Sequence, residues 1–509
     1  METEPKIAGR REWIGLSVLV LPVLLISITV TVLYFALPFL SADLQPSGPE
    51  QLWIVDIYAF WLAGLLIVMG TLGDRIGRRR LLLVGAAVFG ITSAAAAYAP
   101  SAEMLIVLRA LQGAAAATLM PSTLALIRNM FHQPRQRRLA IAIWAAGFSG
   151  GSVLGPIVGG WMLERFWWGS VFLINVPIMI LLLVLGPILL PEYRDQQAGR
   201  LDMVSAALTL VAVLPVVYGV KDIAEQGLSS TAVLGIAVGL AAGASFIWRQ
   251  RTLTDPMLDL RLFADRGFGI SLITSTLAIF ALMGLFYFIA QYLQLVLGLR
   301  PFVAGILTLP AAGMALVGSM LAVVVVRWAR PGFVIGGGML LAGAGFAVLS
   351  QLEGEPGVQT LVIGLALLGA GLGAVQAVAS DLVVTVAPEE RAGSASAVLE
   401  AGTEFGAALG VAVLGSLGLA IYRWSFAAPA GLPPEAAQTA RETLGGAVQV
   451  AARLPDQARA ALLAAARTAF TGGMRVAAIS GAVVLVATAV MAAIQLRQVT
   501  IEENADQAR

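Results

Sequence analysis

The residues Gly70-Thr-Leu-Gly-Asp74-Arg75-Ile-Gly77-Arg78-Arg79-Arg80 form a short polar loop between two long apolar runs. Glycines allow the chain to turn tightly, and the Asp74 carboxylate can sit near a neighbouring helix end or pair with an arginine. The arginine cluster is typical of a cytoplasmic membrane surface. An ordinary basic loop would explain the arginines, but it would not explain the ordered Gly, Asp and Gly.

Composition places the whole chain in a membrane. Of its 509 residues, 59% are hydrophobic and only 12% are charged, which leaves too little polar surface to coat a soluble globule. The chain has no cysteine, so disulfides and thiolate metal sites are excluded, and we expect no metal. The net charge of +2 does not suggest nucleic-acid binding. The first apolar run is as long as a membrane span, so no cleavable signal peptide is expected.

Apolar runs of about 20 residues predict fourteen transmembrane helices. They fall into a block of six, then two, then a second block of six, which would put both termini on one side of the membrane. We therefore expect an all-α membrane protein with two six-helix bundles, residues 1–200 and 266–509, and a two-helix insert, residues 201–265. The predicted spans are 13–39, 51–72, 81–99, 103–126, 139–162, 169–190, 203–220, 230–248, 267–295, 303–326, 333–351, 358–385, 393–422 and 472–495.

The distribution of basic residues predicts the orientation. Twenty arginines and lysines fall in the terminal segment and the connections on its side, whereas three, Arg165, Lys221 and Arg300, fall in the opposite short connections. Because positive residues concentrate in cytoplasmic loops, we expect both termini in the cytoplasm and the chain in the cell's inner (plasma) membrane.

One outer connection, residues 425–471, is much longer than the others. It contains Pro433-Pro434 and two alanine-rich stretches that are divided by Leu454-Pro455. Alanine favours helix and proline interrupts it, so the pattern predicts an extracellular helical hairpin before the last span. The alternative interpretation is a flexible linker.

The polar loop that begins at Gly70 resembles the signature loop of the major facilitator superfamily. In that family its residues take part in conformational gating, a role that the resemblance implies here for Gly70, Asp74, Arg75, Gly77 and Arg78. Within the fourth predicted span, Leu108-Arg109-Ala-Leu-Gln112-Gly113 also resembles a family motif, whose arginine is associated with proton coupling. The alternatives for Arg109 are a side chain that reaches outward to water or one that pairs with a carboxylate for structure.

The fifth predicted span reads Gly147-Phe-Ser-Gly150-Gly151-Ser-Val-Leu-Gly155-Pro156-Ile-Val-Gly159-Gly160. Glycines four residues apart let a partner helix approach closely, and proline breaks a backbone hydrogen bond. Gly151, Gly155, Pro156 and Gly159 could therefore form a pivot and seal. The segment resembles the antiporter motif of the drug-exporting branches of the superfamily, which implies export.

These motifs and the fourteen spans together resemble the drug:proton antiporter branch that contains the quaternary-ammonium-compound and mycobacterial fluoroquinolone efflux pumps. The resemblance implies a proton-coupled multidrug antiporter that exports lipophilic, often cationic compounds, and it favours a monomer. It does not imply an enzyme, and no nucleotide loop or cofactor motif occurs. The sequence departs from the branch at Thr29, where the relatives commonly carry an aspartate nine residues before the proline of Ala36-Leu37-Pro38.

Two carboxylates lie in the thirteenth predicted span, which includes residues 394–416. Glu400 and Glu404 are four residues apart, so they share one helix face. Charges at membrane depth usually serve a function, and a carboxylate in a low-dielectric cavity can exchange a proton for a cationic ligand. We predict that this pair couples proton movement to transport and that Glu404 also binds substrate.

Other residues could complete a substrate cavity. Asp56 in the second span could contact a cation or serve only as a structural partner, and Asp381 is a candidate gate residue. Flat hydrophobic cations favour aromatic rings and polar neighbours, although any one aromatic could instead face lipid or pack against other helices. The candidates are Tyr34, Phe286, Tyr287, Tyr292, Gln112 and Gln376.

Two other functions remain open from the sequence. The same fold could export a lipid or an endogenous antibiotic, as the apolar first span and Thr29 would allow. The chain could also be a membrane sensor that transports nothing, although it lacks a sizeable soluble output domain.

Overall fold

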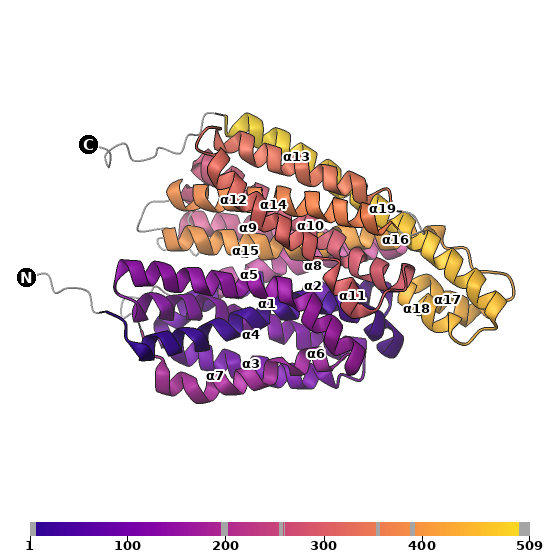
Figure 1. The fold of residues 1–509 in the computed structure, drawn as a ribbon, viewed down its shortest axis with the longest axis horizontal. Helices are drawn as coiled ribbons and strands as arrows, with labels where there is room; N and C mark the ends of the chain where they lie inside the picture. The colour runs from indigo at the N-terminus through magenta and orange to yellow at the C-terminus, as the bar shows by residue number, and fades with distance from the viewer. Residues whose placement is uncertain are drawn as a thin grey trace, which may run out of the picture.

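The computed structural model describes residues 7–194, 202–253, 258, 260–352, 357–386 and 392–497. This part of the chain is helical throughout its regular secondary structure, and 14 helices are long and apolar enough to cross a membrane. Figure 1 shows that these helices run roughly parallel in one elongated bundle. The predicted all-α membrane architecture is confirmed.

The first helix set comprises α1 to α7. Its last span is interrupted at Ile174, so α6 and α7 together correspond to one predicted span. The set occupies one side of the bundle in Figure 1. Its members are α1 (Arg10–Leu44), α2 (Gly48–Ile76), α3 (Arg78–Ala97), α4 (Ala102–Met130), α5 (Pro134–Arg165), α6 (Ser170–Leu173) and α7 (Asn175–Leu189).

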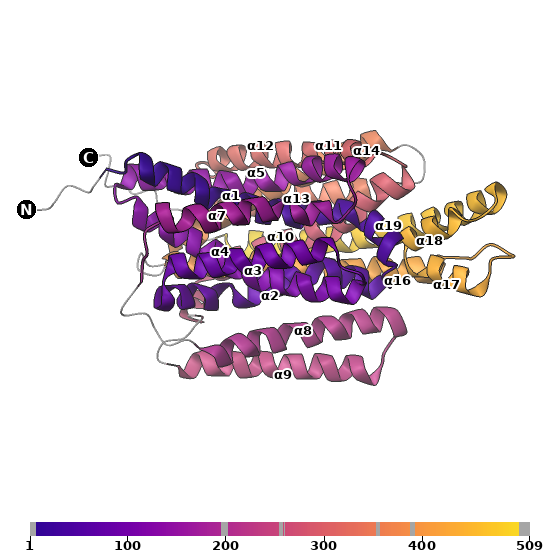
Figure 2. The ribbon, with the colours of Figure 1, turned by 90° about the horizontal axis from the view of Figure 1, so that it is seen from below.

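The insert consists of α8 (Met203–Gln226) and α9 (Ser230–Thr252), which pack side by side. Figure 2 shows this pair below the other helices. Asp202 caps α8 through Ser205 and receives hydrogen bonds from Arg249 on α9 at 2.9 and 3.3 Å. Burial alone would raise the pKa of Asp202, but the hydrogen bonds from Arg249 and Ser205 outweigh it and lower the pKa to about 2. The link between α8 and α9 therefore stays charged at neutral pH.

The second helix set runs from α10 to α19 and lies opposite the first in Figure 1. Two of its long helices contain a π-helical turn, η2 after α10 and η4 after α15. Its elements are η1 (Leu260–Ala264), α10 (Arg266–Gln291), η2 (Tyr292–Val296), α11 (Pro301–Ile306), α12 (Leu309–Val325), α13 (Pro331–Leu349), α14 (Val358–Val386), α15 (Ala392–Gly410), η4 (Val411–Gly415), α16 (Ser416–Ser425), α17 (Pro434–Glu442), α18 (Leu444–Ala451) and α19 (Asp456–Gln495).

The beginning of α1 and the end of α19 lie at one end of the bundle, which we call the terminal end. Helices α17 and α18 project from the opposite, hairpin end in both views. The break at Leu454-Pro455 lies where it was predicted, but the final span does not begin at residue 472. Instead α19 is one unbroken helix of 40 residues. Gly472-Gly473 does not end it, because Gly473 packs against the backbone of Gly418 on α16.

Glycine seams hold the long helices together in both sets. On α5 a glycine recurs every four residues along the face against α1, and a Cβ at Gly151, Gly155 or Gly159 would collide with Leu24, Thr31 or Val32. On α15, Gly402, Gly406 and Gly410 pack in the same way against Leu272, Thr276 and Phe280 of α10. The fifth long helix of each set therefore packs on the first through glycines four residues apart, as an internal repeat would require.

The two helix sets meet closely at the hairpin end. On one side, Gly160 of α5 lies against Pro301, and Gly305 of α11 lies against the Pro156 carbonyl. The Arg300 guanidinium also pairs with Glu164 at 2.6 Å. On the other side, the Tyr287 hydroxyl of α10 donates to the Gln51 amide oxygen of α2 at 3.0 Å. These contacts close the interface between the sets at this end.

Candidate functional site

Glu400 and Glu404 lie on α15 and are both half-buried. They point away from α10, because the glycines that pack on α10 lie at positions 402 and 406, on the opposite face of the helix. No residue that the structure describes forms an ion pair with either carboxylate. Such acids can bind a proton or a cationic ligand without first breaking an ion pair.

The first helix set faces Glu404. The side chains of Tyr34 on α1 and Tyr58 on α2 are near enough to interact electrostatically with both Glu404 and Arg109. The next residue, Phe405, contacts Phe60 of α2 with ring centroids 6.4 Å apart. The predicted coupling residues therefore lie around the interface between the two helix sets.

Arg109 is buried in the first set, with 1% of its surface exposed. Its Nε donates to the Ile54 carbonyl at 3.2 Å, and Nη1 donates to the Gln112 amide oxygen at 3.1 Å. The guanidinium carbon lies 4.4 Å from the centroid of the Tyr58 ring. In the described part of the chain, Arg109 thus neither reaches water nor pairs with a carboxylate. A backbone carbonyl, an amide and an aromatic face stabilise it.

A chain of buried hydrogen bonds extends from Arg109 across the first set. The Gln112 amide donates to Ser93 on α3 at 3.0 Å, and the Asn175 amide of α7 approaches the same hydroxyl at 3.4 Å. The Thr29 hydroxyl donates to Asn175 at 3.0 Å. Thr29 and Gln112 are therefore joined inside the first set. Sequence reasoning did not identify Ser93 or Asn175, because the chain appears only when α1, α3, α4 and α7 pack together.

Asp56 forms an ion pair with Lys221, which the sequence predicted to lie in a short connection between spans. Lys221 was expected in a short connection, but it lies inside α8, and its Nζ is 2.7 Å from Asp56 Oδ2. Both side chains are buried, with 2% and 0% exposed. The predicted span ended at residue 220 because the Lys221-Asp222 pair lowers hydropathy. The prediction was wrong because the buried carboxylate compensates the lysine charge.

The predicted aromatic residues separate into two groups. Tyr34 and Phe286 meet across the two helix sets, with ring centroids 5.4 Å apart. Tyr287 instead forms part of the closed contact at the hairpin end through its bond to Gln51, and Tyr292 is fully buried beyond it. Gln376 on α14 is half-buried, and its side-chain oxygen has no hydrogen-bond partner among the described residues.

The predicted gating loop is anchored within the first set. Asp74 accepts from Arg78 Nε at 2.7 Å, so the aspartate pairs with an arginine, one of the two arrangements expected. Gly77 adopts a φ of +112°, a left-handed backbone conformation that favours glycine. The Arg78 amide donates to the Tyr193 carbonyl at 2.9 Å, which ties the loop to the segment after α7. Gly70 is half-buried, whereas Arg75 and, on α14, Asp381 are exposed.

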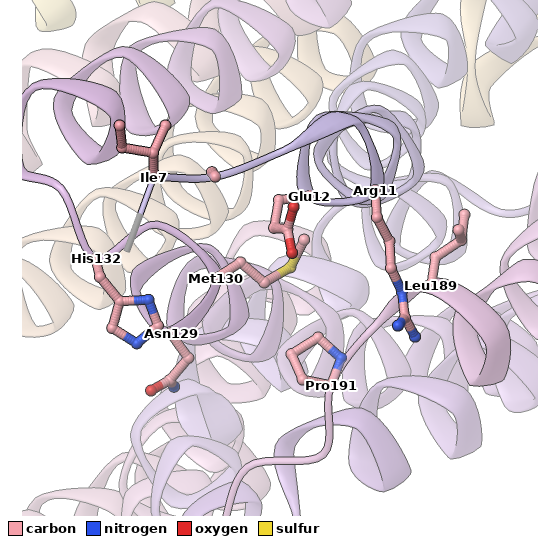
Figure 3. A pocket seen from close by; sticks show the side chains of 9 residues that line it. Ile7, Arg11, Glu12, Asn129, Met130, His132, Leu189 and Pro191 are labelled. Carbon is pink, nitrogen blue, oxygen red and sulfur yellow. The ribbon is translucent and has the colours of Figure 1, made fainter. Parts of the chain in front are cut away.

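A separate cavity of about 220 Å³ lies at the terminal end, between the start of α1 and the ends of α4 and α7. Figure 3 shows the side chains of Arg11, Glu12, Asn129 and His132 around it. None of the predicted site residues lines this cavity. Among the described residues, no group of three histidines, cysteines or acids could hold a metal ion.

Comparison with known families decides the identity of this fold. The family model described as Major Facilitator Superfamily matches residues 19–358. The chain belongs to the major facilitator superfamily. It is therefore a membrane transporter and not an enzyme.

Within this superfamily the chain resembles several drug-resistance proteins. It is 46% identical to the multidrug efflux pump LfrA of Mycolicibacterium smegmatis, over 96% of this chain and 97% of that protein. It is 38% identical to the methyl viologen resistance protein SmvA of Salmonella typhimurium, over 94% and 97% of the two chains. It is 33% identical to the tetracenomycin C resistance and export protein of Streptomyces glaucescens, over 94% and 91%.

Solved structures support the same fold. The chain aligns with a bacterial homologue of the human lysosomal transporter Spinster with a TM-score of 0.67 and 17% identity. The alignment covers 96% of this chain and 98% of the other.

Proposed function

We propose that this chain is a proton-coupled multidrug efflux antiporter that exports lipophilic, often cationic compounds. The main support is the position of Glu404, which is half-buried, forms no ion pair with a described residue and lies near enough to Tyr34 and Tyr58 of the first helix set to interact with them electrostatically. The names of the similar proteins, which include a multidrug efflux pump and a methyl viologen resistance protein, support drug export.

Exchange would follow from competition for one set of carboxylates. Glu400 and Glu404 are one helical turn apart, so their protonation is coupled, and a cation that binds between them favours proton release. Tyr34 and Phe286 would offer ring edges and faces to a flat substrate, and Gln376 would offer an amide oxygen. Arg109, whose guanidinium carbon lies 4.4 Å from the centroid of the Tyr58 ring, would hold that ring beside the proposed site.

Alternation between two open states would use the contacts already described. Residues 1–200 and 266–509 would move as two bundles around the central site, with residues 201–265 as an insert. Gly151, Gly155, Pro156 and Gly159 on α5 would form the pivot and seal, and the loop containing Gly70, Asp74, Arg75, Gly77 and Arg78 would act at the terminal end with Asp381. The concentration of positive residues at the terminal end supports an orientation with both termini in the cytoplasm and the hairpin outside. A monomer in the plasma membrane is sufficient for this cycle.

A second substrate class is an endogenous antibiotic without a charge. The similarity to a tetracenomycin C export protein favours it, as does Thr29, which leaves α1 without a membrane-embedded acid.

The function can be tested by ethidium efflux from proteoliposomes under an imposed pH gradient. We expect efflux to stop when the gradient is collapsed and to fall by about tenfold or more in Glu404→Gln, because a group that binds both proton and cation is lost. Glu435→Gln is the matched control, since Glu435 is exposed on α17. Efflux that continues in Glu404→Gln without a gradient would refute proton coupling through this residue.

A further inference from the structure

The ammonium group of Lys221 occupies a complete cation-binding arrangement. Its Nζ lies 2.7 and 3.0 Å from the two carboxylate oxygens of Asp56 and 3.6 Å from the centroid of the Trp53 ring. A carboxylate combined with an aromatic face is the chemistry that binds organic cations. Lys221 therefore fills, from within the protein, a position that suits a cationic ligand.

The position of Asp56 connects this arrangement to the interface between the helix sets. Lys221 approaches from the insert, and it lines a cavity of about 10 Å³ together with Leu52 of α2 and Leu419 of α16. On the other side, Asp56 interacts electrostatically with Tyr34 and Tyr287, which belong to the interface. Asp56 thus lies between the insert helix and the region proposed to bind substrate.

We propose that Lys221 is a specificity-determining residue that acts as a tethered cation at Asp56. While Lys221 is bound, Asp56 adds no net negative charge to the substrate region, and Glu400 and Glu404 carry the task of binding a cation. A substrate with one positive charge needs only these glutamates. A substrate with two separated positive charges would gain from Asp56 only if Lys221 were absent. The inference rests on the proposed function and extends it by naming the favoured substrate as a monocation.

The test compares export of ethidium, a monocation, with export of methyl viologen, a dication, in the same proteoliposomes. We expect Lys221→Met to raise the ratio of dication to monocation export by about three- to tenfold, because the Asp56 carboxylate loses the ammonium group that occupies it. The double variant Asp56→Asn/Lys221→Met removes both charges and should return the ratio to that of the parent. It also keeps the test possible if the single variant fails to fold, because no unpaired charge remains buried.

Asp222→Asn is the matched control. Asp222 is the next residue on α8, but its carboxylate accepts hydrogen bonds from Ser229 and Thr231 at the turn into α9, not from α2. We expect the Asp222→Asn protein to have the same ratio of dication to monocation export as the parent. If only the double variants fold, the inference is supported when Asp56→Asn/Lys221→Met has the export ratio of the parent and Lys221→Ala/Asp56→Glu has a raised ratio. The second of these variants keeps a carboxylate at position 56 but removes its lysine partner.

Three results would overturn the inference. They are an unchanged ratio in folded Lys221→Met, a double variant whose ratio stays as high as that of Lys221→Met, and a double variant that is inserted but exports neither cation. If the parent itself exports no cation under a pH gradient, the proposed function fails first. If the parent exports cations but the Lys221 variants leave the ratio of dication to monocation export unchanged, only the specificity role of Lys221 is rejected.

Discussion

The hydrogen bond from Thr29 to Asn175 explains the structural role of this side chain. In the family pattern an acid at this position would help to bind protons or cations, but the Thr29 hydroxyl is buried and donates to Asn175 inside the first helix set. It begins the hydrogen-bond chain that ends at Arg109. Its role in this chain is therefore to satisfy a buried amide, which is a structural requirement.

We predict that Thr29→Val lowers the free energy of unfolding by about 0.5–1.5 kcal/mol, because the Asn175 amide oxygen loses its donor. The ratio of dication to monocation export should not change. Thermal unfolding of the purified protein in detergent measures the first effect, and the two-substrate assay measures the second.

Thr31→Val is the matched control for Thr29→Val. The Thr31 hydroxyl bonds only to carbonyls of its own helix, at 3.1 and 3.2 Å, so its removal leaves no side-chain amide unpaired. A Thr29→Val protein with normal stability and a changed export ratio would show that Thr29 faces the substrate.

The sequence predicted the charged residues of the candidate site but not all of their partners. The pair Glu400 and Glu404 was recognisable because carboxylates in an apolar run are rare and their spacing places them on one face. Lys221 was misplaced because hydropathy is read along the chain, whereas the carboxylate that compensates its charge lies on α2, 165 residues away. Nothing local in the sequence showed that Arg109 would lie over the ring of Tyr58.

Among the helices, α5 combines two kinds of contact. Its glycine seam packs on α1 within the first set, and near the hairpin end Pro156 and Gly160 contact α11 of the second set. The first contact can persist through a transport cycle, whereas the second must separate when the hairpin end opens. The packing of Gly305 against the Pro156 carbonyl leaves no room for a side chain.

We predict that Gly305→Ala shifts the protein toward a state open at the hairpin end. The added methyl group would overlap the Pro156 carbonyl oxygen, which should cost about 1–3 kcal/mol in the closed state alone. Because the chain has no cysteine, a single cysteine in place of Gln291 can report opening through its rate of thiol labelling. We expect the labelling rate at position 291 to be higher in Gly305→Ala than in the parent.

Gly313→Ala serves as the control, because a Cβ at Gly313 on α12 would meet no atom within 4 Å. Equal labelling rates in Gly305→Ala and Gly313→Ala would contradict a closing role for the contact between α5 and α11.

The existence and approximate limits of these helices followed from hydropathy. The identity of their partners did not, because glycine spacing predicts close packing without naming the helix that packs.

For the whole molecule, the described contacts fit two helix sets that meet closely at the hairpin end. The sets are joined at the hairpin end by Glu164 with Arg300 and by Gln51 with Tyr287 and Gln291. These bonds connect segments that are distant in sequence, so sequence patterns alone could predict two blocks of spans but not which end is closed. In the proposed cycle these bonds would break together when the hairpin end opens.

We predict that a short bis-maleimide cross-link between cysteines at positions 51 and 291 stops ethidium export. The two glutamine side chains approach to 3.5 Å across the sets, so the link would hold the hairpin end closed. Export should remain before the cross-linker is added.

The control pair places cysteines at Ser27 and Ser152, whose hydroxyl oxygens are 2.6 Å apart within the first set. The same cross-link there should leave export intact, because α1 and α5 move together. If cross-linking positions 51 and 291 does not impair export, the hairpin end does not open during transport.

The unbroken course of α19 has a mechanical consequence for the hairpin. A helix of 40 residues is about 60 Å long, so a tilt of about 10° around its midpoint moves its tip by about 5 Å. Helix α18 packs against α19, and Gln449 of α18 also donates to the Ala42 carbonyl of α1 at 2.8 Å, so such a tilt would change the contacts between the hairpin and the first helix set. The hairpin thus joins the tip of α19 to the first helix set. An antibody fragment that clamps the tip of the hairpin would resist the tilt without entering the proposed substrate region.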